Sequence, residues 1–251
     1  TAIGTYAGQN ITTGATNTAI GDAALASTTT ASDNTAVGQG SLNANITGAS
    51  NTAVGRNAMY YNTTGGNNVA IGRDALHKNT TGASNSALGQ NALADNTTGT
   101  GNTASGKDAL DANTTGDYNV GLGYLALSSN TTADDNTAVG TSALTANTTG
   151  ANNTAVGRKA LLTNSTGTSN TAVGWSALQD NTTGTDNTAV GVLALENTTT
   201  GVNNTGMGRS ALAANTTGGQ NTAIGYQALI ANTASDNTAT GFNALYTNTT
   251  G

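Results

Sequence analysis

The sequence predicts an all-β protein, a parallel β-solenoid (β-roll) in which each 17-residue repeat forms one coil. The first observation is self-similarity, because NTAVGRKALLTNSTGTS at 153–169 is followed directly by NTAVGWSALQDNTTGTD at 170–186. The second is composition, since Thr and Val favour strands whereas Asn, Thr and Gly are weak helix formers. The third is a strict period without proline, which argues against a disordered chain although only 35% of residues are hydrophobic.

Glycine marks the period. It recurs every 17 residues from Gly4 to Gly225, and Gly241 follows after 16 because one repeat lacks a residue. Residues 1–251 therefore form a single array of about 15 repeats of the type NTAVGxxALxxNTTGxx, whose positions we number from 1, the first Asn, to 17. Fifteen coils at the usual strand spacing would stack to about 70 Å. The chain begins and ends within a repeat, which we interpret as an excerpt or a processed product of a longer fibre.

Each repeat is expected to form two short strands, at Thr-Ala-Val (positions 2–4) and at Ala-Leu (positions 8–9). The glycines of positions 5 and 15 are expected at the corners with φ > 0. Position 4 is apolar in every repeat except at Ser105 and Thr240, and position 9 is Leu or Met except at Gly8. These two rows are predicted to point into the core.

The predicted core is thin. One branched aliphatic and one Leu per coil contribute about 3–6 kcal/mol, whereas ordering the backbone costs about 1–2 kcal/mol per residue. Positions 3 and 8 are almost always Ala, so another backbone must approach them closely, either across the coil or from another chain. We expect the chain to gain stability by oligomerising, with the Ala-lined face as the contact surface.

Asparagine forms two further rows, at positions 1 and 12. Such side chains can bond the same side chain one coil away or the backbone of their own turn, and we predict this structural role. Asn-Thr-Thr at positions 12–14 also reads as a glycosylation sequon, but the repeat alone accounts for its many copies.

Several functional classes are disfavoured by composition. The net charge of −6 gives no basic footprint for nucleic acid, and no apolar stretch is long enough to span a membrane. Cysteine is absent, so there is no disulfide or thiolate metal site. The single histidine, His77, is interpreted as a solvated surface residue. We therefore predict no enzymatic activity, no catalytic residue, no metal site and no cofactor.

The corner at positions 6–7 carries most of the sequence variation. Charged residues that occupy it include Arg56, Arg73, Asp74, Lys107, Asp108, Arg158, Lys159 and Arg209. Four aromatic residues at position 6 are candidates for contact with a surface ligand or receptor: Tyr124, Trp175, Tyr226 and Phe242. A second corner, at positions 16–17, carries acids that we interpret as exposed, since the GGxGxD calcium repeat is lacking. These acids include Asp33, Asp134, Asp135, Asp186 and Asp236.

The string Asn-Thr-Ala-Val-Gly followed by Ala-Leu resembles the head repeats of trimeric autotransporter adhesins, the YadA-like family, and equally the repeat regions of phage tail-fibre proteins. The resemblance covers essentially the whole chain. It implies a left-handed parallel β-roll, three chains together, displayed outside a cell or on a virion. The Asn-Thr-Thr-Gly arm makes this repeat longer than the usual adhesin head repeat.

The predicted function is that of a structural and adhesive fibre protein, extracellular and homotrimeric, able to continue head to tail as a filament. The alternative is an ice-binding solenoid that uses a flat Asn/Thr array at positions 12–14. The residues do not distinguish an adhesin from a phage fibre or a free filament, and they do not identify the ligand.

Overall fold

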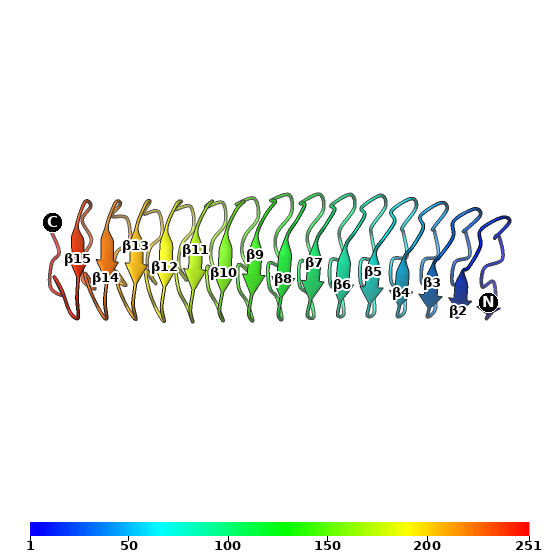
Figure 1. The fold of residues 1–251 in the computed structure, drawn as a ribbon, viewed down its shortest axis with the longest axis horizontal. Helices are drawn as coiled ribbons and strands as arrows, with labels where there is room; N and C mark the ends of the chain where they lie inside the picture. Colours follow the sequence, from blue (N-terminus) through cyan, green and yellow to red (C-terminus); the bar gives the residue numbers. More distant parts are fainter. Residues whose placement is uncertain (251) are drawn as a thin grey trace. The chain divides into compact units, whose positions relative to one another are not determined.

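The computed structural model describes residues 1–250, which form β-strands joined by turns and bends, without a helix among them. The chain divides into two compact bodies, Thr1–Thr132 and Ala133–Gly251, which we call the N-terminal and C-terminal bodies. Each body is a parallel β-solenoid with one strand per 17-residue coil, as the sequence predicts. Within each body, consecutive strands lie side by side in chain order (Figure 1).

The strands fall at positions 2–4 of the repeats. The N-terminal body contains β1 (Ala2–Ile3), β2 (Thr18–Ile20), β3 (Thr35–Val37), β4 (Thr52–Val54), β5 (Val69–Ile71), β6 (Ser86–Leu88), β7 (Thr103–Ser105) and β8 (Val120–Leu122). The C-terminal body contains β9 (Thr137–Val139), β10 (Thr154–Val156), β11 (Thr171–Val173), β12 (Thr188–Val190), β13 (Thr205–Met207), β14 (Thr222–Ile224) and β15 (Thr238–Thr240). Equivalent residues of neighbouring coils are paired, for example Ala155 with Ala172.

The prediction of a second strand at positions 8–9 is wrong. Positions 6–11 form a run of turns. Within it, the residues at repeat positions 7 and 9 take left-handed backbone angles, such as Ser142 with φ 58° and Leu144 with φ 51°. A strand needs φ near −120°, so this segment cannot extend. It still bonds between coils, because the Leu144 amide donates to the Ala160 carbonyl at 3.0 Å.

The core contains only one of the two predicted rows. Leu at position 9 is buried from Leu25 to Leu229, whereas the aliphatic row at position 4 faces outward, with Ile71 42% exposed. Successive side chains of a strand point to opposite faces, and Ala at position 3 takes the inward place. There is no space for a larger residue: a Cβ added to Gly206, at position 3, would lie 3.2 Å from Leu195 Cγ.

The small residues of positions 3 and 8 therefore line the interior of a single chain. Ala155 and Ala160, for instance, are both fully buried. Of the two explanations for their size, close approach across the coil is the one observed, and the prediction of an Ala-lined contact surface between chains is wrong.

The two glycine corners differ. Gly174, at position 5, has φ +140°, a conformation that favours glycine. Gly167, at position 15, does not have positive φ, contrary to the prediction, but a Cβ there would lie 2.4 Å from the Gly184 carbonyl oxygen. Close coil stacking thus favours glycine at both corners, since a Cβ on Gly174 would lie 2.5 Å from the Gly191 carbonyl oxygen, and the backbone angle adds a second requirement at position 5.

Both Asn rows are structural, as predicted. At position 12, Asn164 Nδ2 donates to Asn147 Oδ1 at 2.8 Å and to the Gly167 carbonyl at 3.0 Å. At position 1, the Asn170 amide donates to Asn153 Oδ1 at 3.0 Å. Because the position 12 side chains are fully buried in most coils, the sequon nitrogen is not available for a glycan in the folded coil.

Candidate interaction surface

The outer face of each strand carries two parallel rows of side chains. Position 2, mostly Thr, is half-buried, and position 4, mostly aliphatic, is half-buried or exposed. In the N-terminal body the aliphatic row comprises Ile3, Ile20, Val37, Val54, Ile71, Leu88 and Leu122. In the C-terminal body it comprises Val139, Val156, Val173, Val190, Met207 and Ile224. Contiguous apolar side chains on a surface mark sites of interaction.

The corner that follows each strand exposes position 6, where the sequence placed its candidate contacts. Tyr124, Trp175, Tyr226 and Phe242 are all exposed there, with Trp175 at 46%. The rings of Tyr226 and Phe242 stack at 5.3 Å between centroids. Lys107 Nζ lies 5.8 Å from the centroid of the Tyr124 ring. The structure thus brings one pair of candidate aromatics together and leaves Trp175 without a ring partner among residues 1–250.

A second aromatic group lies at positions 10–11 of the N-terminal body. Tyr60 and Tyr61 meet edge to face at 4.8 Å, and their rings lie 5.7 Å and 5.1 Å from that of His77. His77 is therefore half-buried rather than solvated, a correction to the sequence prediction. Gly40, at position 7, gives a signal that the sequence analysis missed: a Cβ there would lie 3.1 Å from the Tyr60 ring.

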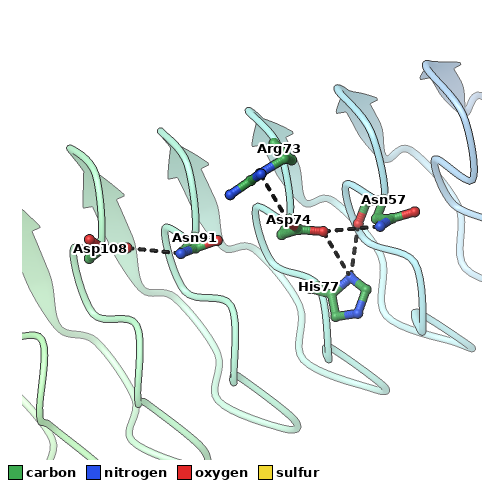
Figure 2. A network of polar contacts seen from close by, with 6 residues as sticks. All are labelled: Asn57, Arg73, Asp74, His77, Asn91 and Asp108. Atoms are coloured by element: carbon green, nitrogen blue, oxygen red, sulfur yellow. Dashed lines mark hydrogen bonds and ion pairs between the residues drawn. The ribbon is translucent and has the colours of Figure 1, made fainter.

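Polar contacts connect this group to the neighbouring corner (Figure 2). His77 Nδ1 lies 3.1 Å from the Asn57 carbonyl oxygen and 3.9 Å from Asp74 Oδ1. Asp74 also accepts from Asn57 Nδ2 at 3.1 Å and pairs with Arg73 at 3.3 Å. Asn91 donates to Asp108 at 2.9 Å in the same manner two coils further on. These carboxylates stabilise adjacent coils, and much of their charge is compensated locally.

The charged groups beside this cluster have shifted pKa values. Burial, reinforced by the nearby Asp95 and Asp108 carboxylates, raises the pKa of Asp111 to about 6. A hydrogen bond to Asp95, with Nζ to Oδ1 at 2.8 Å, raises the pKa of Lys78. In the C-terminal body, burial and Asp180 raise the pKa of Glu196.

Residues 1–250 contain neither a cluster of metal ligands nor a pocket. A search of the described residues for a long apolar helix that could cross a bilayer found none. The arrangement can present rows of side chains to a partner, and it offers no enclosed site.

Comparisons with protein-family models, with curated proteins and with solved structures found no match to this chain.

Proposed function

We propose that this chain is a non-catalytic structural and adhesive fibre protein that acts outside the cell, on a cell or virion surface, as a parallel homotrimer. The observation that carries the proposal is the aliphatic row at position 4. The Leu residues at position 9 of the inner coils are already buried within the chain, and backbone groups of neighbouring coils bond to one another. A continuous apolar row remains on the outer strand face, and association with another chain would cover it.

The interior supports the same conclusion. Each coil buries one large side chain, the Leu of position 9, together with small Ala residues. At about 1.5–3 kcal/mol for a fully buried Leu, this contribution is small beside the entropy cost of ordering 17 residues. A second buried row, contributed by position 4 when copies associate, would double the large apolar side chains buried per coil.

Head-to-tail association of copies is proposed as well, because each coil pairs with its neighbours in register, and heterologous contacts of this kind generate open filaments.

The test is the mass of the 251-residue chain in solution. We expect a trimer by mass photometry or analytical ultracentrifugation. The triple variant Val156→Thr, Val173→Thr, Val190→Thr should dissociate it while keeping the β-rich circular dichroism spectrum, because Thr240 shows that Thr is accepted at position 4.

The matched control is Thr149→Ser, Thr166→Ser, Thr183→Ser at exposed position 14, which should leave the trimer intact. A folded wild-type chain that stays at 24.5 kDa would refute the proposal. The exposed aromatics Tyr124, Trp175, Tyr226 and Phe242 are proposed to contact the unidentified surface ligand or receptor.

Ice binding is a second candidate, on a different surface from the predicted one. Asn at position 12 is buried, so the Asn/Thr array of positions 12–14 does not exist on the outside. The regular outward rows of Thr and aliphatic residues at positions 2 and 4 form the remaining periodic surface. An ice-recrystallisation assay separates the two candidates, because an adhesive fibre has no reason to inhibit crystal growth.

A further inference from the structure

A second, longer period is superimposed on the 17-residue repeat. A cation occupies position 6 in every third coil, at intervals of 51 residues. The four cations are Arg56, Lys107, Arg158 and Arg209. They follow β4, β7, β10 and β13, and all four are exposed. Arg73 is the one position 6 cation outside this series. It pairs with Asp74 at 3.3 Å, as Lys107 of the series pairs with Asp108 at 3.3 Å.

Acids repeat with the same spacing at position 17, on the other side of the strand. Asp33, Asp135, Asp186 and Asp236 precede β3, β9, β12 and β15, and Ser84 takes the corresponding place before β6. The last interval is 50 residues because of the shortened repeat. All four acids are exposed.

The two charged rows lie at opposite ends of the strands. Positions 17 and 6 flank the three-residue strand and its adjoining residues, so the C-terminal body has an acidic edge and a basic edge beside its outer strand face, whereas positions 6–7 of the N-terminal body also carry Asp22, Asp74 and Asp108. The separation is cleanest in the C-terminal body, where positions 6–7 hold Arg158, Lys159 and Arg209 and no acid. Arg158, Arg209, Asp135 and Asp186 form no ion pair within residues 1–250.

Acid and cation are offset by a constant amount. Arg56 follows Asp33 by 23 residues, Arg158 follows Asp135 by 23, and Arg209 follows Asp186 by 23. The acid-bearing strand is in each case one coil before the cation-bearing strand, an axial step of about 4.8 Å. A neighbouring copy displaced by one coil would therefore bring Asp33, Asp135 and Asp186 each level with an arginine.

We propose that copies of this chain associate edge to edge in parallel, the acidic edge of one against the basic edge of the next, and that the three-coil charge period sets a one-coil stagger between neighbours. An antiparallel neighbour would place like edges together. The proposal rests on the homotrimer proposed above and specifies its contacts and axial register.

Three chains satisfy this rule and two or four do not. In a closed ring of three, two interfaces displace the neighbour by one coil each, and the third displaces it by two coils in the opposite direction. These two displacements differ by three coils, which is the 51-residue charge period. All three interfaces then align acid with cation. A circuit of two or four interfaces leaves one of them out of phase. The charge pattern therefore favours a ring of three chains over a ring of two or four.

Charge serves here to select the register, and the aliphatic face supplies most of the affinity. Exposed ion pairs contribute little to stability, but complementary edges discriminate against wrong arrangements. The discrimination is needed because a uniform 17-residue repeat offers an equivalent apolar contact at every coil, about every 4.8 Å. A slip of one coil keeps the aliphatic contact but separates every acid from its cation.

The test compares trimer dissociation constants of full-length charge variants at low and high NaCl. Arg158→Asp with Arg209→Asp should weaken association about ten-fold or more at low salt. Adding Asp135→Arg and Asp186→Arg to that variant should restore the constant to within about two-fold, since both edges are then exchanged. The differences should shrink at 1 M NaCl, where the Debye length is about 3 Å.

A composition-matched variant tests the register itself. Arg209→Tyr with Tyr226→Arg moves one cation by a single coil at unchanged net charge, and it should weaken association at low salt. Circular dichroism checks that each variant remains folded. The inference would be overturned if the variant with all four charge changes associated no more tightly than Arg158→Asp with Arg209→Asp. It would also be overturned if Arg209→Tyr with Tyr226→Arg left association unchanged. Neither result would contradict the trimer itself. A wild-type chain that never associates would overturn the homotrimer as well.

Discussion

The rows at positions 4 and 9 look alike in sequence and lie on opposite sides of the coil wall. Leu144, at position 9, is fully buried, whereas Val156 and Val173, at position 4, are more than a third exposed. Both rows are aliphatic along nearly the whole chain. The difference shows that a narrow solenoid encloses one large side chain per coil, and that a second apolar row must belong to a surface.

The largest expected effect is at the buried row. Leu144→Asp places an unpaired carboxylate in the interior, and such a change costs several kcal/mol, about 4 or more. In a solenoid each coil contacts only its neighbours, so the stack should break at this coil. Urea unfolding followed by circular dichroism measures the loss.

Two variants of the same coil sharpen this test. Val139→Asp, on the outer face, should change the unfolding of the dissociated chain by less than about 1 kcal/mol but prevent association. Thr141→Asp, at exposed position 6, should leave folding nearly unchanged. Equal damage from Leu144→Asp and Val139→Asp would show that the two rows have been assigned to the wrong sides.

The next effect concerns the buried Asn row. Asn164→Ala removes the bonds to Asn147 at 2.8 Å, to the Gly167 carbonyl at 3.0 Å and from Asn181 at 2.7 Å. Because buried polar groups without partners cost about 1–3 kcal/mol, we expect a loss in that range by urea unfolding. Thr166→Ala, two residues away and exposed, should cost little. An equally large loss of unfolding free energy for Thr166→Ala would contradict a specific contribution of the buried Asn row.

The sequence was sufficient for the fold and for the rows that repeat without variation. The period, the strand at positions 2–4, the buried Leu row and the Asn rows all follow from residue type and spacing, whereas the second strand predicted at positions 8–9 does not form. Which face of the strand points into the coil was not predicted correctly. Ala at position 3 indicates that face, because side chains alternate along a strand and a uniformly small residue marks the side with little space.

The surface was harder to predict, because its features depend on neighbours one coil apart. The contact of Tyr60 with Tyr61 and His77 joins residues of two coils, and only Gly40 in a third coil hints at the space they need. The left-handed backbone at Leu144 could not be predicted from residue type, since leucine rarely adopts positive φ. Coil closure imposes it against local preference.

A smaller effect is expected from Asp111, whose pKa is raised to about 6 chiefly by burial. The folded chain holds this proton more tightly than the unfolded chain, so stability falls as pH rises from about 4 to about 6. Asp111→Asn should therefore stabilise the fold at pH 7, by about 1 kcal/mol after allowance for solvent screening. The gain should vanish near pH 3, where Asp111 is neutral in both states. Asp22→Asn, at an exposed corner, is the control, and a gain independent of pH would contradict the explanation.

The smallest expected effect distinguishes backbone strain from side-chain packing at the corner. Ser176, at position 7, has φ 53° and a buried hydroxyl without a hydrogen-bond partner among residues 1–250. Gly40 occupies the same position with φ 66°, so the coil accommodates glycine there. Ser176→Gly relieves the left-handed strain and removes the unpaired hydroxyl, against the entropy that glycine adds to the unfolded chain. We expect a net stabilisation of about 0.5–1 kcal/mol by urea unfolding. Ser176→Ala removes the hydroxyl and keeps the strain, so it should gain less than Ser176→Gly; a larger gain from alanine would show that the hydroxyl, and not the backbone angle, limits stability at this corner.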